Sequence, residues 1–388
     1  MNGGTVGLDT LTRAERTALR AVLIRATAAA GRADARDELR PLVDAAPMHA
    51  LPAAAGLHRV AGTVLRGLDG VTGVPDNVRA ELGVRRTQSA LHHLRVVGAL
   101  SQIARVFDEA ELSWVVMKGP VVAGLFYPDV GDRTYGDLDL LLDRRDFALG
   151  MQLLEDLGYE HGIHNWALAE RMLAGQVSLT SPLVSIDLHW HLHYSHEDRR
   201  PFAIDPEAMV GRARRVVVSG VNVPTLDPVD TLLMLAFHAA RSDGHRLVWH
   251  KDVERALAVE QPDLDELVRR CRSARCAPPV GLILARARGL LDAEFPDEII
   301  HALTPVSLRV ADRVASGFGP SVQLHDRSTP SRVYTRSVRS SLAATLYAVP
   351  ERGARLLRRF LRPPRVNESD DAEEKASYLQ AVSASVKG

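Results

Sequence analysis

Two short apolar segments of this chain carry aspartates in their interiors, and this feature constrains the fold most strongly. Residues 137–142 read DLDLLL and residues 184–190 read VSIDLHW. Both segments predict buried strands. Asp137 and Asp139 stand at positions i and i+2, so their side chains leave the strand on the same face. A carboxylate in a buried strand needs a partner, and Asp187 would join the pair if the two strands lie side by side.

The remaining pattern places these strands between helical regions. A strand is predicted at 113–117 and a hairpin at 216–224, whereas most of the chain before 110 and after 227 has apolar residues at helical spacing. The predicted class is α+β, with a small mixed β-sheet core, flanking helices, and additional helical N- and C-terminal regions. We expect a helical N-terminal region over residues 1–110 and the sheet core over 111–225. A second helical domain is expected over 226–320, followed by an Arg-rich segment with an acidic, partly mobile tail over 321–388.

The last part of the chain is the least regular. Residues 320–345 are polar and rich in Ser and Arg, which predicts a surface loop or partial disorder. Residues 356–361 predict a short basic helix, and one further helix is expected in the tail. We interpret the basic cluster here as a solvated face balanced by the acidic tail, with an RNA or acidic-peptide contact as the alternative; it consists of Arg355, Arg358, Arg359 and Arg362.

Composition argues against several classes of function. The chain of 388 residues has 48 basic and 48 acidic side chains, so its net charge gives no general case for nucleic-acid binding. Cys271 and Cys276 have no second pair to complete a zinc site and are expected to be free thiols. The chain has no run of 18 apolar residues and no signal-peptide pattern, so we expect a cytoplasmic protein that does not span a membrane.

The aspartates predict a magnesium site. Two carboxylates on one strand face repel each other, and a divalent cation between them removes this cost. Mg²⁺ is the expected ion, with Mn²⁺ as the second choice, because hard oxygen ligands suit it and it keeps positions for phosphate oxygens. If Asp187 lies beside Asp137 and Asp139, the three can hold two metals around a phosphoryl displacement, and Asp187 can accept the proton of the attacking hydroxyl.

A potential phosphate site precedes the aspartates. Lys118-Gly119 follows the strand at 113–117, and glycine permits close approach of the backbone to a phosphate. Lys118 would add a point charge to the same phosphate. Arg133 lies four residues before Asp137, and its planar guanidinium suits a phosphate as well.

With these residues the chain resembles the nucleotidyltransferase superfamily of the polymerase-β type. The signature of that superfamily is a Gly-containing turn after a strand, then Asp-x-Asp, then a third carboxylate on a later strand. More narrowly, residues 116–190 are similar to a bacterial family described as uncharacterised nucleotidyltransferases. The matching positions are Lys118-Gly119, Tyr127-Pro128, Arg133, Asp137 with Asp139, Gly158-Tyr159 and Asp187-Leu188-His189-Trp190, and the resemblance extends to His238, Trp249 and Asp252. The superfamily usually has Gly-Ser or Gly-Gly in place of Lys118-Gly119, so the serine that commonly contacts a phosphate is absent.

The resemblance implies transfer of a nucleoside monophosphate from an NTP to an acceptor hydroxyl, with release of pyrophosphate. Asp137, Asp139 and Asp187 would be the catalytic and metal-binding residues. The nucleotide would contact Lys118, Gly119, Arg133, His189, His238 and Lys251. ATP is the favoured NTP, and the acceptor is expected to be a peptide, a protein, a sugar or another small molecule rather than a nucleic acid.

Two alternative functions remain open at this point. The missing serine favours a catalytically weak relative that binds a nucleotide or a peptide and works as an accessory protein. His189, His191 and His193 alternate along the chain and would share a face if the strand continued that far, which favours a metal hydrolase instead.

Overall fold

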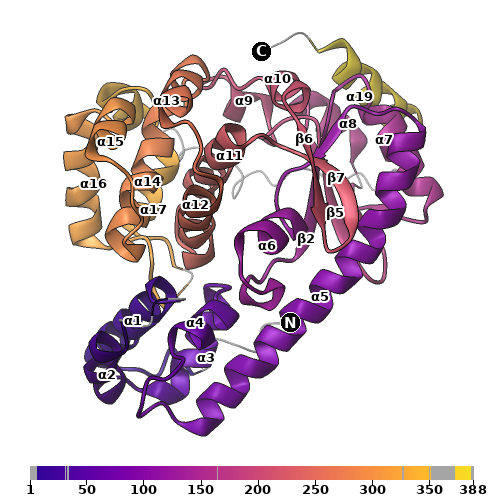
Figure 1. Ribbon diagram of the computed structural model, residues 1–388. Coiled ribbons are helices and arrows are strands. Elements are labelled where there is room, and N and C mark those ends of the chain that lie inside the picture. Colours follow the sequence, from indigo (N-terminus) through magenta and orange to yellow (C-terminus); the bar gives the residue numbers. More distant parts are fainter. Residues whose placement is uncertain are drawn as a thin grey trace.

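A mixed β-sheet with helices packed around it forms the framework of the chain (Figure 1). The computed structural model describes residues 7–30, 32, 35–163, 165–325, 327–348, 350 and 372–385. Helices lie before, between and after the strands in the sequence, which confirms the predicted α+β class.

The sheet places the strand with Asp137 and Asp139 at its centre. In the described residues it has seven strands in the order β3-β4-β5-β2-β1-β7-β6. β2 pairs with β5 in parallel and with β1 in antiparallel orientation, and β1 pairs with β7 in parallel. The strands are β1 (Trp114–Val116), β2 (Asp137–Leu142), β3 (Glu160–His161), β4 (Gln176–Thr180), β5 (Ser185–His189), β6 (Arg214–Val218) and β7 (Val221–Thr225).

The predicted strands and the hairpin are confirmed, but two strands were missed. β6 and β7 form the hairpin, with Ser219-Gly220 at its turn. β3 and β4 were not predicted, although buried Val177 and Leu179 of β4 alternate with half-buried Gln176 and exposed Ser178 and Thr180. This period of two is the signal of a half-buried strand. β4 pairs with β5 and thereby makes β5 an interior strand, next to β2.

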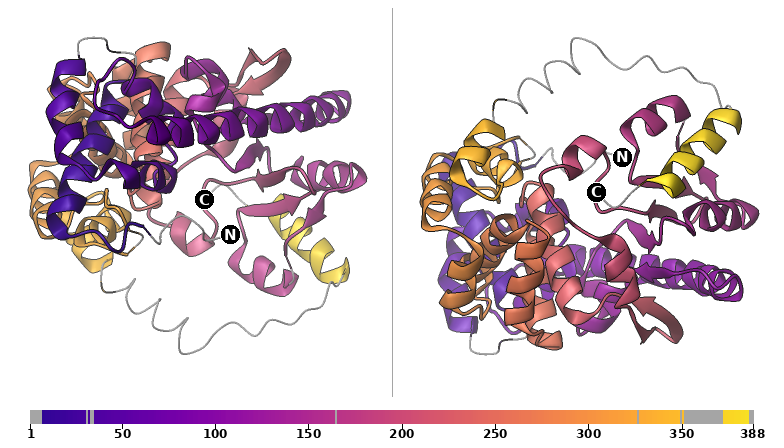
Figure 2. Two further views of the ribbon diagram at one scale, coloured as in Figure 1. Left: turned by 90° about the horizontal axis from the view of Figure 1, so that it is seen from below. Right: turned by 90° about the horizontal axis from the view of Figure 1, so that it is seen from above.

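The N-terminal region is helical, as predicted. Thr12 starts its first helix with a capping box, in which the Thr12 hydroxyl accepts from the Glu15 N–H and the Glu15 carboxylate accepts from the Thr12 N–H. The last helix of the region, α5, runs from the other N-terminal helices along the sheet, as Figure 2 shows. The elements are α1 (Arg13–Ala28), α2 (Arg36–Ala45), η2 (Met48–Ala50), α3 (Leu51–Leu57), α4 (Ala61–Gly67) and α5 (Asp76–Glu109).

Short helices connect the strands, and one helix from the tail packs onto them. The connecting elements are α6 (Pro120–Phe126), η3 (Val130–Asp132), α7 (Phe147–Asp156), α8 (Trp166–Met172), α9 (His196–Arg199) and α10 (Pro206–Gly211). The helix expected in the tail is α19 (Ala372–Ala384). Tyr378 of α19 is fully buried, lies 5.5 Å from the Trp166 ring and donates to the Ala174 carbonyl. The tail thus completes the hydrophobic core on this side of the sheet.

The C-terminal helices form a separate layer. They are α11 (Pro228–Arg241), α12 (Leu247–Glu260), α13 (Leu264–Ser273), α14 (Ala277–Leu291), α15 (Asp297–Leu303), α16 (Val306–Phe318) and α17 (Pro330–Ser337). The prediction of a surface loop over 320–345 is wrong for α17. Its Ser331 and Thr335 are buried, and Arg286 donates to the Ser331 hydroxyl. Polar side chains fill this interface, so the apolar periodicity that predicts a helix is missing. The predicted basic helix at 356–361 and the four arginines of its cluster lie outside the described residues.

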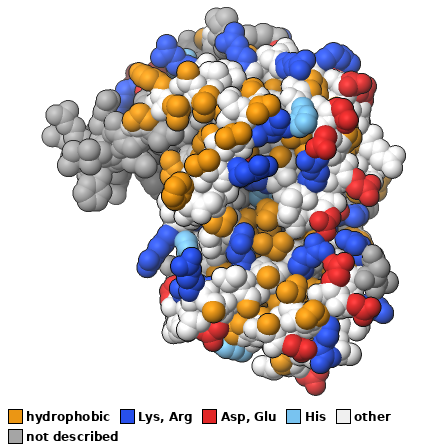
Figure 3. Space-filling model, turned by 90° about the vertical axis from the view of Figure 1, so that its left-hand side faces the viewer, with side chains coloured by type: hydrophobic (Ala, Val, Ile, Leu, Met, Phe, Trp, Pro, Cys, Tyr) orange, Lys and Arg blue, Asp and Glu red, His pale blue; other side chains and the backbone are white. Residues whose placement is uncertain are grey.

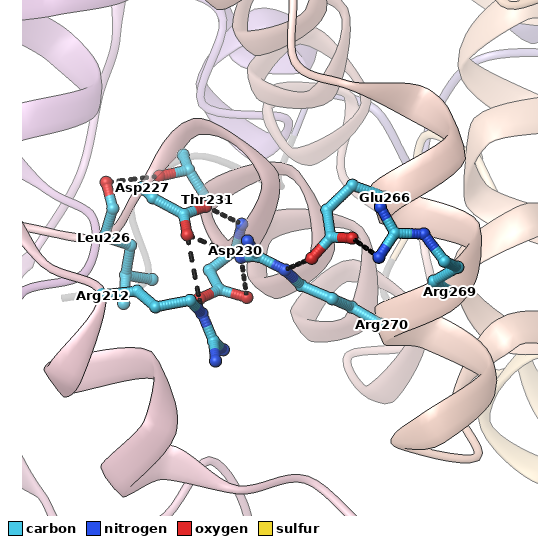
Figure 4. A network of polar contacts seen from close by, with 8 residues as sticks. All are labelled: Arg212, Leu226, Asp227, Asp230, Thr231, Glu266, Arg269 and Arg270. Atoms are coloured by element: carbon cyan, nitrogen blue, oxygen red, sulfur yellow. Dashed lines mark hydrogen bonds and ion pairs between the residues drawn. The ribbon is translucent and has the colours of Figure 1, made fainter.

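A polar network holds the N-terminus of α11 to its neighbours (Figure 4). Asp227 caps α11 by accepting from the Asp230 N–H. The buried Asp230 carboxylate lies 2.8 Å from Nε of Arg212 and 2.9 Å from Nη1 of Arg270 on α13. Arg270 also pairs with Glu266. The network orients α11, which carries His238 toward the sheet.

The outer surface of the C-terminal layer is partly apolar. On α16, side chains spaced four residues apart are exposed: Val306, Val310, Val314 and Phe318. Figure 3 faces this side of the molecule and shows apolar side chains between charged ones. Inside the same layer, Cys271 and Cys276 are buried free thiols, as predicted. None of the described helices has both the length and the hydropathy that crossing a membrane requires.

Candidate functional site

The sheet register brings two of the predicted carboxylates side by side. Asp139 on β2 lies directly opposite Asp187 on β5. Leu138 and Leu140, on the other face of β2, are fully buried in the core. Asp137 lies two residues before Asp139 on the same face of β2 and lines a cleft. The strands that carry the three aspartates are therefore adjacent, as the sequence interpretation required.

The donor atoms around Asp139 fit a divalent cation. In the described residues, one ligand atom each from Asp139, Asp187 and His189 lies within 4.8 Å of the other two. Both carboxylate oxygens of Asp139 and both ring nitrogens of His189 are buried and lack a well-oriented hydrogen bond to any described residue. The Ser178 hydroxyl of β4 donates to Asp187 Oδ1 at 2.5 Å and orients this carboxylate. Two carboxylates suit a hard ion such as Mg²⁺, and His189 can serve as a ligand or a hydrogen-bond donor.

The electrostatics separate the two aspartates of β2. Burial raises the pKa of the Asp137 carboxyl, and the neighbouring Asp139 charge raises it further. Burial acts in the same direction on Asp139, but Lys118 and His189 outweigh it and hold the Asp139 pKa below its usual value. Asp139 is therefore the carboxylate that stays ionised at the centre of the site.

Lys118 and Gly119 form the turn that follows β1. The Lys118 ammonium lies 2.9 Å from Asp139 Oδ1. Gly119 has φ +68°, and a Cβ at this position would lie 3.0 Å from the Asp137 carbonyl oxygen. Glycine is thus needed both for the backbone conformation and for the close approach to β2. The turn holds the Lys118 ammonium and the Gly119 backbone close to the aspartates of β2.

Arg133 is held by a carboxylate of α12. Its guanidinium donates to both oxygens of Asp252, at 2.7 and 2.8 Å, and to the Gly119 carbonyl oxygen at 3.1 Å. The Tyr127 hydroxyl also donates to Asp252, at 2.8 Å. Burial lowers the Arg133 pKa, but Asp252 outweighs this effect and the net shift is upward. Arg133 therefore connects α12 to the Gly119 turn.

A cleft of about 440 Å³ opens in front of these residues. Three parts of the sequence line it: the turn after α3, the strand ends of the sheet, and the C-terminal helices. Figure 1 shows α6 and α12 facing each other above α4. The lining residues include Arg59, Lys118, Gly119, Arg133, Asp137, Asp139, His238, Arg241, Arg246, Trp249, Asp252 and Arg336. Sequence reasoning did not identify Arg59, Arg241, Arg246 or Arg336, because arginine is frequent along the whole chain and no local motif marks these four.

The predicted histidines divide between the cleft and the core. His238 lines the cleft at a ring distance of 5.7 Å from Trp249, and burial together with Lys118 lowers its pKa to about 3. β5 ends at His189. His193 stacks on His191 and on Phe202, at 5.9 and 5.2 Å. Neither His191 nor His193 belongs to the metal-binding group found in the described residues, so the three imidazoles do not form one centre.

Lys251 lies apart from the other predicted residues. Its ammonium is 2.8 Å from Glu254, and it lines a small cavity beside Tyr127 and Arg66. The side chains of Lys251 and Asp252 leave adjacent positions of α12 in different directions, and only Asp252 lines the cleft.

Comparison with known proteins places the chain in a family. A search of curated proteins found no match. A family model described as "Uncharacterised nucleotidyltransferase" matches residues 44–292, well over half of the chain. The matched part contains the whole sheet, the aspartates and every cleft residue named above except Arg336. The chain therefore belongs to the family of uncharacterised nucleotidyltransferases.

Proposed function

We propose that this protein transfers a nucleoside monophosphate from an NTP to an acceptor hydroxyl in a reaction that needs Mg²⁺. The observation that supports this most directly is the pairing of Asp139 with Asp187 across β2 and β5, next to a cleft that also exposes Asp137. Lys118 is the cation beside Asp139, but one ammonium cannot neutralise three neighbouring carboxylates, and a divalent cation would remove the remaining cost of holding them together. ATP is our first choice of donor, and the acceptor is a peptide, a protein, a sugar or another small molecule.

In this proposal Asp137, Asp139 and Asp187 hold the metal, and a bound divalent ion would stabilise charge on the reacting phosphate and the leaving pyrophosphate. Lys118 lies beside Asp139 and would contact a phosphate at the same place. The acceptor oxygen forms a bond to the α-phosphorus while the bond to the pyrophosphate oxygen breaks. Asp187 accepts the hydroxyl proton, since it is only partly buried and lies directly opposite Asp139.

The other predicted residues take distinct roles. The Gly119 backbone would border the phosphates, and His189 would position Asp139 or contact a phosphate, since its Nε2 lies 3.4 Å from Asp139 Oδ1. His238, beside Trp249, would contact the nucleotide in the cleft. The guanidinium of Arg133 is already bound by Asp252, so we assign it the role of positioning the Gly119 turn. Lys251 faces another cavity, and we assign it no nucleotide contact.

The test is calorimetric titration of each of the four NTPs, with and without Mg²⁺. We compare the parent protein with Asp139→Asn, which keeps the shape of the side chain but removes its charge. Asp265→Asn, exposed on α13, is the matched control. We expect one NTP to bind the parent and the control more tightly with Mg²⁺, and Asp139→Asn to lose this dependence. If no NTP binds, or Mg²⁺ has no effect on the parent, the accessory-protein alternative replaces this proposal.

A further inference from the structure

Two arginines of the cleft have no acidic partner among the described residues. They are Arg59 and Arg246, for which no ion pair or side-chain hydrogen bond is found in the described chain. The other cleft arginines are engaged: Arg133 with Asp252, Arg336 with Asp243 at 3.7 Å, and Arg241 with the Arg336 carbonyl oxygen. The Nε atom of Arg246 is buried and lacks an acceptor.

The fold holds these two arginines beside one contact, between the turn after α3 and the start of α12. Arg59 follows α3 in the left-handed region, with φ +57°, and its N–H donates to the Gly56 carbonyl oxygen. Its neighbour His58 is buried and receives hydrogen bonds from the start of α12: the Leu247 N–H donates to His58 Nδ1, and the Val248 N–H donates to the His58 carbonyl oxygen, both at 3.3 Å. Arg59 and Arg246 are therefore the residues next to a fixed contact between the N-terminal helices and α12.

Their mutual repulsion is not offset by a direct partner. Burial lowers the pKa of Arg59 and the Arg246 charge lowers it further; Asp137 and Asp139 act in the opposite direction, and the net shift is downward. Arg246 also lies over the Trp249 ring, 5.8 Å from its centre. Two guanidinium groups of like charge, partly removed from water, are costly to hold together unless an anion lies between them.

We propose that Arg59 and Arg246 clamp a phosphate-type dianion in the cleft, where the turn after α3 meets the start of α12. The planar forks of two arginines match the oxygens of a phosphate, which can neutralise both charges. The phosphate belongs either to the tail of the NTP or to the acceptor. The choice between these two sources of the phosphate rests on the proposed function. The anion site itself does not depend on that function.

The test is calorimetric titration of inorganic pyrophosphate and inorganic phosphate into the protein without Mg²⁺. The variants are Arg59→Gln, Arg246→Gln and the double variant, with Arg105→Gln, exposed on α5 and outside the cleft, as the control. Loss of charge-assisted hydrogen bonds predicts weaker binding by roughly ten- to a hundredfold in each single variant. Arg59→Lys should fall between the parent and Arg59→Gln, because it keeps the charge and loses the fork. Thermal unfolding of each variant checks that it is folded.

Two further titrations identify the source of the phosphate. If the clamp holds the NTP tail, both glutamine variants lose affinity for the NTP but not for the corresponding NMP. If it holds a phosphate of the acceptor, NTP affinity stays at the parent value, and inorganic phosphate still binds the NTP-saturated parent. Equal affinities of the parent and the double variant for both inorganic anions would overturn the clamp. That result would leave the Mg²⁺ test of the proposed function untouched, because the two experiments use different variants and ligands.

Discussion

The buried ion pair between Arg133 and Asp252 allows a quantitative test of how α12 is fixed to the sheet. Their side chains are 6% and 2% exposed, and the contact is bidentate. Asp252→Ala leaves the Arg133 charge buried without a partner, which costs about 3–5 kcal/mol. The Tyr127 hydroxyl also loses its acceptor, at about 1 kcal/mol. We therefore expect the free energy of unfolding to fall by about 4–6 kcal/mol, a large part of the usual total of about 5–15 kcal/mol.

The double variant Arg133→Met/Asp252→Leu distinguishes the net stability contribution of the ion pair from the cost of leaving one charge buried without a partner. Replacing a buried ion pair by apolar side chains of similar volume is often close to neutral, so the double variant should be more stable than Asp252→Ala alone. Urea unfolding is followed by tryptophan fluorescence and by circular dichroism, and the two transitions must coincide for a single free energy to apply. The exposed control Asp265→Ala should stay within about 0.5 kcal/mol of the parent.

Two results would refute this reasoning. One is a loss below about 1 kcal/mol in Asp252→Ala, which would mean that the pair is solvated or rearranges. The other is a double variant as unstable as the single one, which would mean that the two charges are not coupled.

Two further predictions concern packing and pH. Gly67→Ala would place a Cβ 1.8 Å from a carbonyl oxygen of α1, so α1 and α4 must separate, and we expect a loss of about 3 kcal/mol or more. Gly83→Ala, in open space on α5, should instead gain about 0.5–1 kcal/mol, and equal thermal midpoints for the two variants would contradict this packing. His58 and His250 are buried, and burial lowers their pKa values to about 3 and about 4. Below about pH 6.5 the unfolded chain therefore binds more protons at these sites than the folded one. The free energy of unfolding should decrease by roughly 1 kcal/mol per histidine as the pH is lowered from 7.5 to 5.5. Urea midpoints measured at these two pH values test the sign, and a midpoint that is higher at pH 5.5 would exclude this linkage.

Much of the candidate site could be predicted from local sequence patterns. The alternation of Asp137, Leu138 and Asp139 determines which side chains share a face, because successive residues of a strand point to opposite sides. The position of Gly119 shortly after β1 marks a turn, because glycine tolerates the left-handed backbone found there. The pairing of the strands decided whether these residues come together in one site. Asp187 meets Asp139 only because β5 lies parallel to β2 in one register, and a shift of one residue would turn Asp187 to the other face.

The tertiary structure alone decided the roles of the arginines and histidines. Arg133 is bound by Asp252, which is distant in the sequence, and no local pattern predicts that contact. His191 and His193 leave the face of His189 because β5 ends and the Trp190 indole N–H donates to the Ala174 carbonyl oxygen. The placement of Arg59 beside the start of α12 depends on two hydrogen bonds from α12 to His58, one to its ring Nδ1 and one to its carbonyl oxygen. Side-chain direction follows from a few neighbouring residues, whereas charge pairing depends on distances between segments that only the folded chain brings together.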